Sequence, residues 1–453
     1  MAIQYRTAAE LAAGIEAGVR SGRLAPGSRL PTVRALAAEY GLAPGTVAAA
    51  FRTLRERGIV ETSGRRGTVV RARPPVGARS ASPTPTPAGV RDLTRGIPDP
   101  ALLPPLPPAP TLGPAGGPES PEPRTYGSAA IDPVLLGLTR QRFAADGVPA
   151  DAIVLTSGAL DAIERLLTGA AAPGDLIAVE DPGWGNLFDL IAALGLVPEA
   201  VAVDDDGPVP DDVARAMRRG ARALILTSRA QNPTGAAVSA ERAATLAGLV
   251  PPDVLVIEDD HAAEVAGRPL GAVCATRHRL VPDGPWAFVR SVSKPYGPDL
   301  RLAVVAADPA TVDRVESRQR LGPGWVSGIL QGLVVALWSD PDVDMLLATA
   351  TAAYAARRGA LIEALATRGI AAHGRTGVNV WVPVADETAA VVALREAGWA
   401  VTPGSRFRVR SGPGIRITVS QLDPAEAPAL AAAVAAAVAP ASARRGRGAT
   451  YAV

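Results

Sequence analysis

The sequence predicts a multidomain protein in which a small, basic helical unit with a two-stranded hairpin precedes a large α/β domain with a mostly parallel sheet. The length of 453 residues exceeds that of one ordinary domain. Residues 1–75 contain twelve arginines and five acidic residues, whereas the remainder has 34 basic and 39 acidic residues. From about residue 125, strand-like apolar segments alternate with helical segments, which is typical of a parallel sheet covered by helices.

The N-terminal unit, residues 1–73, has the signals of three helices and a hairpin. A capping box at Thr7–Glu10, then Thr32 and then Pro44, each mark the start of a helix. Residues 59–71 form two β-rich segments around a turn of glycine and arginine, which predicts the hairpin. The excess of positive charge in this unit indicates that it binds a polyanion.

The large domain is expected at residues 91–438, after a linker rich in Pro, Ser and Ala at 74–90 and before a disordered tail at 439–453. Its expected strands are 153–156, 176–180, 223–227, 254–259 and 287–292, and its expected helices include 160–168 and 240–249. Ligands of such sheets bind beyond the carboxyl ends of the strands, so the residues that follow these strands are candidates for a site.

The composition excludes several other classes of protein. One cysteine, Cys274, cannot form an internal disulfide and fits a reducing cytoplasm. Three scattered histidines and that cysteine argue against a metal site. No apolar stretch has the roughly 18 residues of a membrane-spanning helix, and the first residues lack the pattern of a secretory signal. We therefore expect a cytoplasmic protein without a metal or a membrane partner.

Lys294 is the single lysine among the 46 lysines and arginines of the chain. Arginine can replace lysine where only a positive charge is needed, but not where an amine must lose its proton and attack a carbonyl. Lys294 lies just beyond an expected strand, near the hydroxyls of Ser291 and Ser293 and before Arg301, all of which could bind a phosphate. It is therefore a candidate nucleophile, and the alternative is a surface lysine retained by chance.

Four other segments at strand ends have residue types that suit a phosphorylated aromatic ligand. Gly158 and Ala159 begin a helix whose backbone amides can hold a phosphate, although an ordinary turn has the same composition. Trp184 could stack on a flat ring or pack in the core. Asn232, in Asn-Pro-Thr-Gly, could bind a phenolic oxygen or belong to a plain turn. Three acids at 258–260 could keep a pyridine nitrogen protonated or begin a solvated loop.

Taken together and in this order, these segments resemble the fold-type I aminotransferases over roughly residues 91–438. The start of the chain, with Gly22-Arg23-Leu24, then Pro26-Gly27 and Gly41-Leu42, resembles a GntR-type winged helix-turn-helix. The two parts in this order resemble the MocR subfamily of transcriptional regulators, which covers almost the whole chain. The resemblance implies bound pyridoxal 5′-phosphate, a homodimer and a double-stranded DNA operator as partner.

The resemblance also assigns roles to residues of the site. It implies a lysine for the internal aldimine, a carboxylate for the pyridine nitrogen, partners of the phenolic oxygen, a stacking ring and a phosphate set. Lys294 is the implied lysine, and Asp259, in preference to Asp260, is the carboxylate. Asn232 and His261 are the partners of the phenolic oxygen, and Trp184 is the stacking ring. The residues for the phosphate are Gly158, Ala159, Ser291, Ser293 and Arg301. His261 stands where MocR proteins usually have tyrosine, and a neutral imidazole can make the same hydrogen bond. Tyr126 is expected to reach the phosphate of the neighbouring subunit, and Arg416 to clamp the carboxylate of a substrate or effector, with a surface salt bridge as the alternative.

The resemblance places the helix expected at 44–57 in the major groove of DNA. The DNA-binding residues that it implies are Arg34, Thr46, Arg52 and, at the tip of the hairpin, Arg65 and Arg66; a solvated basic face is the alternative. We therefore expect a transcriptional regulator that senses pyridoxal phosphate, or an amine or amino acid that reacts with it, through Lys294. The alternative is an active aminotransferase with an auxiliary N-terminal domain.

Overall fold

The computed structural model describes residues 5, 7–20, 24, 27–56, 59–62, 67–70, 86–87, 89–106 and 125–439. Most of the expected linker, the expected tail after residue 439 and the two hairpin arginines, Arg65 and Arg66, lie outside these ranges.

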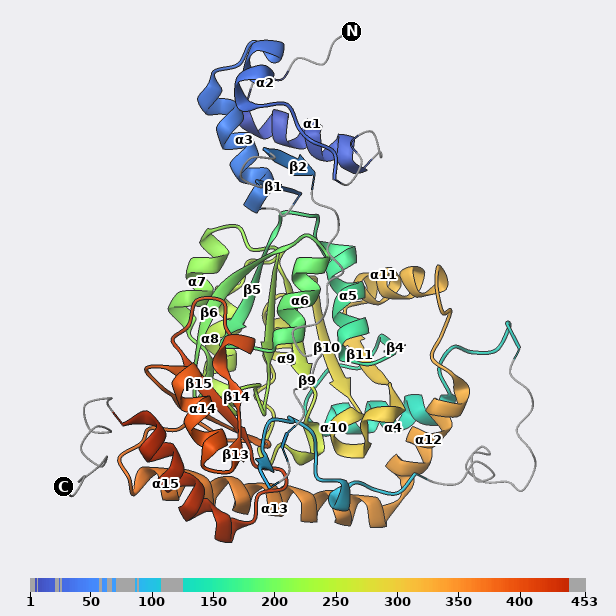
Figure 1. Ribbon diagram of the computed structural model, residues 1–453. Coiled ribbons are helices and arrows are strands. Elements are labelled where there is room, and N and C mark those ends of the chain that lie inside the picture. Colours follow the sequence, from blue (N-terminus) through green and yellow to red (C-terminus); the bar gives the residue numbers. More distant parts are fainter. Residues whose placement is uncertain are drawn as a thin grey trace, which may run out of the picture.

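The N-terminal unit contains the expected helices and hairpin (Figure 1). Its elements are α1 (Ala8–Arg20), α2 (Val33–Tyr40), α3 (Pro44–Glu56), β1 (Val60–Thr62) and β2 (Thr68–Val70). The hydroxyl of Thr32 accepts a hydrogen bond from the Ala35 N–H at 3.2 Å and so caps α2. Gly41 ends α2 in the left-handed conformation, with φ of 64°. Apolar side chains from the three helices and the hairpin, among them Leu11 and Phe51, form a separate small core.

The large domain is built on an eight-stranded sheet with the order β4-β11-β10-β9-β8-β5-β6-β7. The strands are β4 (Ile153–Thr156), β5 (Leu176–Asp181), β6 (Val197–Asp204), β7 (Gly207–Pro208), β8 (Ala223–Thr227), β9 (Leu255–Asp260), β10 (Trp286–Ser291) and β11 (Ala303–Ala307). Five adjacent strands, from β10 to β6, are parallel. β11 is antiparallel to both of its neighbours, so the sheet is mixed. The connection from β10 to β11 is too short for the crossover that a parallel pair requires.

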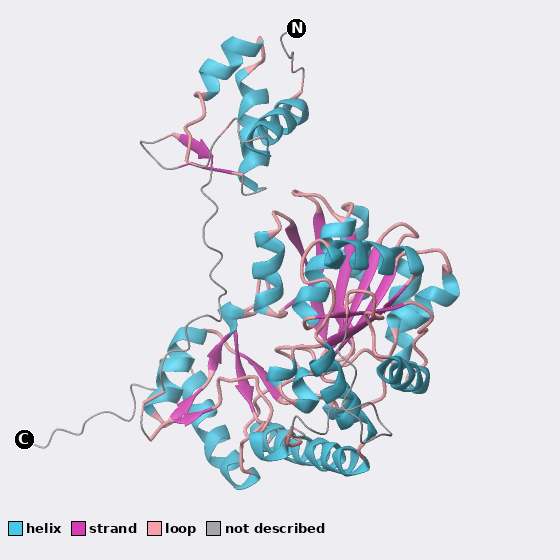
Figure 2. Ribbon diagram, turned by 90° about the vertical axis from the view of Figure 1, so that its right-hand side faces the viewer, coloured by secondary structure: helices cyan, strands magenta, loops and turns pink. Residues whose placement is uncertain are grey.

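Helices cover both faces of this sheet (Figure 2). They are α4 (Pro133–Ala145), α5 (Ala159–Ala170), α6 (Gly185–Ala193), α7 (Pro210–Arg218), α8 (Ala240–Leu249), α9 (Val273–Leu280), α10 (Ser293–Tyr296) and α11 (Pro309–Arg320). Successive strand residues point to opposite faces, and both faces are buried; Leu224 belongs to one apolar core and Ile225 to the other. Burial on both faces explains why these strands are apolar throughout.

The C-terminal part packs beside the sheet; its buried apolar residues up to Tyr354 join one core of the sheet, and most of those from Leu361 onward form a third core. It consists of α12 (Gly328–Ser339), α13 (Pro341–Ala366), β12 (Asn379–Pro383), α14 (Glu387–Glu396), β13 (Trp399–Ala400), β14 (Thr402–Pro403), β15 (Gly414–Thr418) and α15 (Ala427–Val438). β12, β15 and β14 form a three-stranded sheet. The segment that follows the linker, β3 (Arg91–Asp92), pairs in parallel with β13. The beginning and the end of the large domain are thereby joined. None of the helices described is both long and apolar enough to cross a membrane.

Candidate cofactor and effector site

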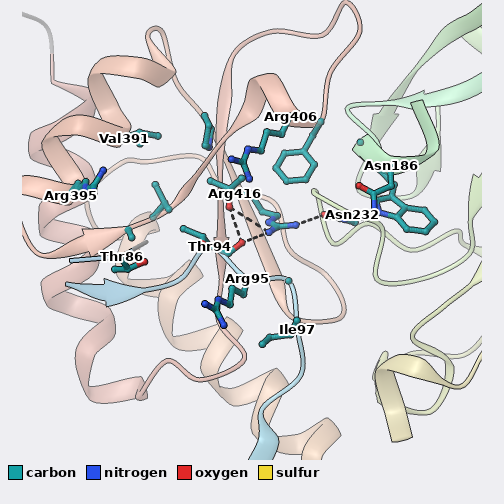
Figure 3. A pocket seen from close by; sticks show the side chains of 18 of the residues that line it. Thr86, Thr94, Arg95, Ile97, Asn186, Asn232, Val391, Arg395, Arg406 and Arg416 are labelled. Atoms are coloured by element: carbon teal, nitrogen blue, oxygen red, sulfur yellow. Dashed lines mark hydrogen bonds between the residues drawn. The ribbon is translucent and has the colours of Figure 1, made fainter. Parts of the chain in front are cut away.

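A cavity of about 660 Å³ lies between the carboxyl ends of the parallel strands and the C-terminal part (Figure 3). Lys294, Asn232 and Trp184 line it from the large sheet. Residues 94–97, which follow β3, and Arg416 of β15 line the opposite wall. Four residues predicted for the site, Lys294, Asn232, Trp184 and Arg416, therefore line one cavity, and one wall comes from segments for which the sequence predicted no element.

Lys294 lies in α10, the single helical turn that follows β10. Its side chain is half-buried, and its ammonium group donates a hydrogen bond to the carbonyl oxygen of Gly96. Desolvation by the surrounding protein, together with the charge of Arg416, lowers the pKa of Lys294 to about 8. An amine with this pKa is in part unprotonated near neutral pH, as a nucleophile for an aldehyde must be.

The three acids at the end of β9 point in different directions. Glu258 accepts hydrogen bonds from the Ser228 hydroxyl and from the first amides of α9. Asp260 is fully buried and accepts from Arg229 at 2.8 and 3.0 Å and from Arg290 at 2.7 and 2.9 Å. These ion pairs occupy the Asp260 carboxylate, so it is not available to a ligand.

Asp259 differs from its two neighbours because one of its oxygens is free. It is 4% exposed, and its Oδ1 atom has no hydrogen-bond partner among the described residues. Its Oδ2 atom lies 3.7 Å from Nδ1 of His261. A buried carboxylate oxygen without a partner is costly unless a ligand supplies one. Asp259 is therefore the acid that can face a protonated pyridine nitrogen.

Of the expected phosphate residues, Arg301 reaches the start of α5, where Gly158 and Ala159 lie. The Arg301 guanidinium donates to the carbonyl of Ser157 at 3.2 Å. A side chain at Gly158 would approach within 2.5 Å of this guanidinium, and Gly158 has φ of 100°, so glycine is needed there. Arg301 itself has φ of 38°, a strained conformation for a residue other than glycine. These features hold a cation against the amide end of a helix, which suits a phosphate.

Ser291 ends β10, and Ser293 begins α10, the turn that carries Lys294. Ser291 accepts a hydrogen bond from the Ser293 N–H at 3.3 Å, whereas the buried hydroxyl of Ser293 has no partner in the described part of the chain. With Oδ1 of Asp259 at the end of β9, this gives two buried polar atoms that lack partners in the described part of the chain. The residues present therefore fit a phosphorylated pyridine aldehyde.

Arg416 is buried, with 6% exposure, and so is not part of a surface salt bridge. It donates to Oδ1 of Asn232 at 2.9 Å and to the carbonyl of Thr94 at 2.5 Å, and it lies 4.6 Å from the ring centre of Phe407. Its Nε has no partner among the described residues. Burial, and then the charge of Arg406, lowers the pKa of Arg416 to about 10. The side chains of Asn232 and Arg416 are thus hydrogen-bonded to each other, a contact that the sequence did not predict.

The remaining predicted residues have different surroundings. His261 lines a small cavity of about 40 Å³ together with Lys294 and Asn232. Trp184 lines the main cavity and also packs on a core of the sheet, and its stacking on a ring stays a prediction. Tyr126 is 95% exposed and lies edge-on to Trp325, outside both cavities.

Sequence reasoning missed several residues of this site. Arg229 and Arg290 follow or end the two strands that flank β9, so their pairing with Asp260 depends on strand order, which no local pattern gives. Arg406 and Phe407 lie in the loop before β15. The only signal for them is the run of arginines at 406–410 before the motif of Arg416.

In the N-terminal unit, the predicted DNA-binding residues lie on two successive helices. Arg34 is exposed in the first turn of α2, Thr46 is half-buried in the first turn of α3, and Arg52 is exposed on α3. Their contact with DNA stays a prediction.

Comparisons with known proteins agree with this two-part organisation. Residues 7–70 match the family model of bacterial regulatory proteins of the gntR family, and residues 130–434 match that of aminotransferase class I and II. The chain is 41% identical over 433 residues to the vitamin B6 salvage pathway transcriptional repressor PtsJ of Salmonella typhimurium, covering 94% of this chain and 96% of that one. It is 28% identical over 463 residues to the HTH-type transcriptional regulator TauR of Rhodobacter capsulatus, covering 91% and 92%.

Solved structures show the same fold for the large domain. LysN, the alpha-aminoadipate aminotransferase of Thermus thermophilus, solved with N-(5'-phosphopyridoxyl)-L-leucine, matches with a TM-score of 0.65 at 19% identity, over 78% of this chain and 92% of that one. The kynurenine aminotransferase of Pyrococcus horikoshii matches with a TM-score of 0.68 at 18% identity, over 80% and 92%. The chain therefore belongs to the MocR-type transcriptional regulators, in which a gntR-type DNA-binding domain precedes a pyridoxal-phosphate-binding domain of the class I and II aminotransferase family.

Proposed function

We propose that this chain regulates transcription in response to pyridoxal phosphate, or to an amine or amino acid that reacts with it, and that Lys294 is the point of covalent attachment. One observation carries this proposal. A half-buried lysine, whose pKa is lowered to about 8, lines one cavity with Asn232 and Arg416, in a chain that begins with a gntR-type domain. When bound, the cofactor supplies an electron sink.

The side chains of the site have distinct proposed roles. Asp259 keeps the pyridine nitrogen protonated, because a carboxylate stabilises a proton on a neighbouring base. Asn232 and His261 hold the phenolic oxygen, and Trp184 packs against the ring. Gly158, Ala159, Ser291, Ser293 and Arg301 bind the phosphate. Arg416 binds the carboxylate of an effector in a bidentate manner.

The relative PtsJ is named a repressor of vitamin B6 salvage, which supports pyridoxal phosphate itself as the signal. We propose that this chain acts on genes of the same kind. DNA contact is assigned to α2 and α3, with Arg34, Thr46 and Arg52 on the DNA side and Arg65 and Arg66 at the hairpin.

We also propose that the chain forms a homodimer. Apolar side chains are exposed around the connection between α11 and α12, where Leu321 is 81% and Ile329 66% exposed. Tyr126 lies beside Trp325 in the same region. An apolar surface of this kind is typical of an interface. Light scattering on the purified chain should give the mass of a dimer, and a monomer at micromolar concentration would contradict this.

Absorption spectroscopy and DNA binding test the function together. Purified full-length protein with added pyridoxal phosphate should acquire a visible absorption band, and Lys294→Ala should lose it. In a mobility-shift assay at moderate salt, where nonspecific binding is weak, the protein should bind DNA from upstream of its own gene, and pyridoxal phosphate should change the affinity. A band that survives in Lys294→Ala, or DNA binding that ignores the cofactor, would refute the proposal.

A second candidate function is aminotransferase activity, because the structure brings Lys294, Asn232 and Arg416 to one cavity. The aminotransferase-like fold of the large domain is compatible with this activity. Incubation with an amino donor and a keto-acid acceptor distinguishes the two functions. Sustained turnover favours the enzyme, whereas a single spectral change without product favours the regulator.

A further inference from the structure

The cavity is larger and more basic than the cofactor residues require. Five cations line it: Lys294, Arg95, Arg395, Arg406 and Arg416. No aspartate or glutamate is among the lining residues of the described chain. Arg406 and Arg416 are the half-buried and buried arginines of this set, and arginines in protein interiors are normally paired with acids, so their positive charge indicates an anionic ligand.

The residues at the outer part of the cavity are not those assigned to the cofactor. Thr86, Val391, Ala400 and Val401 line it together with the arginines. The total of about 660 Å³ is within the range of about 300–1,000 Å³ in which pockets enclose small ligands. The cavity therefore has room for an effector beyond the cofactor.

Arg406 differs from the other basic residues of the wall. Arg95 forms an ion pair with Asp92 at 3.4 Å and is largely exposed. Arg395 is exposed on α14. Arg406 is half-buried and close enough to Arg416 for its charge to lower the pKa of that residue. No acid in the described part of the chain forms an ion pair with Arg406. Figure 3 shows the side chains of Arg406 and Arg416 next to each other, with Arg395 set apart beside Val391.

The backbone that carries Arg406 is fixed on both sides. Glu387 accepts hydrogen bonds from the Ser405 N–H at 3.0 Å, and the carbonyl of Phe407 accepts from the Gly183 N–H at 2.7 Å. A side chain at Gly185 would come within 2.4 Å of the Arg406 carbonyl, so the chains approach as closely as glycine allows. This rigid support places an unpaired guanidinium at the cavity in advance, as a binding site requires.

We infer that Arg406 binds a second anionic group of the effector, so that the effector is an amino compound with two negative groups. One is bound by Arg416 and the other by Arg406, and together they offset the repulsion between the two guanidinium groups. This inference rests on the proposed role of Arg416 and names the chemical class that the site selects. The second group is a carboxylate or a phosphate, which a guanidinium binds in the same manner.

Matched ligands test this inference on the full-length protein loaded with pyridoxal phosphate. L-glutamate is compared with L-glutamine, and O-phospho-L-serine with L-serine, by calorimetry and by the absorption of the bound cofactor. We expect at least one compound with two anionic groups to bind about tenfold or more tightly than its counterpart with one, as a charged hydrogen bond gives. Equal binding within both pairs would overturn the inference.

Two variants assign the preference to Arg406. Arg406→Gln should reduce it to about threefold or less, whereas Arg368→Gln, which removes the same charge from an exposed position outside the cavity, should keep it. Arg406→Lys should keep part of the preference, which separates loss of charge from misfolding. A preference that persists in Arg406→Gln places the second group elsewhere and contradicts the inference. Failure to attach the cofactor would instead contradict the proposed function. The two failures are distinguishable, because the absorption band measures cofactor attachment and calorimetry measures the preference between effectors.

Discussion

Asp259 and Asp260 are adjacent residues with opposite electrostatic surroundings. Burial alone would raise the pKa of Asp260, but Arg290 and Arg229 hold it below its ordinary value. Asp259 has no such partners, and its nearest basic group is His261. The sequence presents two equivalent carboxylates, and only the position of β9 between β8 and β10 makes one structural and the other available to a ligand.

The two acids should therefore respond differently to neutralisation. Asp260→Asn leaves two buried arginines without an anion and should lower the free energy of unfolding by about 3–5 kcal/mol. Asp259→Asn removes an unpaired buried charge, so it should leave the stability of the cofactor-free protein unchanged or slightly raised. It should, however, weaken cofactor binding. Urea unfolding of both variants checks this, and equal destabilisation would contradict the assignment.

The lowered pKa of Lys294 predicts the pH dependence of cofactor attachment. Only the neutral amine attacks an aldehyde, so the rate should rise about tenfold per pH unit up to about pH 8 and then level off. Stopped-flow absorbance measures this rate, and a blocked lysine amide with free pyridoxal phosphate is the control. If the rate for the protein rises to pH 10 like that of the control, the amine is not desolvated in solution.

Among the elements, α2 and α3 show how one glycine fixes the geometry of the DNA-binding unit. Gly41 has φ of 64° and no atom near its absent side chain, so only backbone strain opposes a substitution there. Gly45, in the first turn of α3, also has open space around it but lacks the left-handed backbone. The two positions form a matched pair.

Alanine at these positions should have opposite effects. Gly41→Ala should lower the local stability of α2 and α3 by about 1–2 kcal/mol. Gly45→Ala should leave it unchanged or raise it by up to about 1 kcal/mol, because alanine favours helix. Amide hydrogen exchange in the full chain measures both. Similar effects at the two glycines would show that the turn conformation does not limit this unit.

Elements with strong local patterns were predictable, and those that depend on distant pairing were not. β4 and α8 have the expected bounds, and the starts and ends of β5, β9 and β10 differ by at most one residue. The antiparallel β11 and the sheet of β12, β15 and β14 were not predicted, because the sequence of a short apolar segment does not indicate which strand it pairs with. The pairing of β3 with β13 joins residues about 300 positions apart, which local periodicity cannot reveal.

The residues of the site were likewise predictable only where a local motif marks them. Lys294 and Asn232 follow strands, Asp259 lies near the end of one, and all three belong to recognisable motifs, so the sequence could place them at one edge of the sheet. Arg406 and the carbonyls of Thr94 and Gly96 reach the cavity through the packing of the C-terminal part. Their presence depends on tertiary contacts and could not be predicted from spacing.

For the whole molecule, the separation of charge predicts how DNA binding depends on salt. The basic residues are concentrated in the first 75 positions, so attraction to phosphates should dominate affinity. Arg52→Ala should weaken binding and reduce the slope of log affinity against log salt by about 0.9. Arg320→Ala, an exposed arginine of the large domain, is the control and should change neither. Mobility shifts at several salt concentrations measure both, and an unchanged slope for Arg52→Ala would exclude a phosphate contact.

The stretch between β3 and Ile97 is fastened to the rest of the large domain by side chains that a ligand also needs. Lys294 donates to the carbonyl of Gly96, and Arg416 donates to that of Thr94. A lysine that takes up the cofactor loses the ammonium group that makes the first bond, and an arginine that grips a carboxylate turns its donors toward it. Filling the cavity would thus remove two of the bonds that hold this stretch, while the hydroxyl of Thr402 would still donate to the Thr94 carbonyl and the Leu93 N–H to the carbonyl of Ala400.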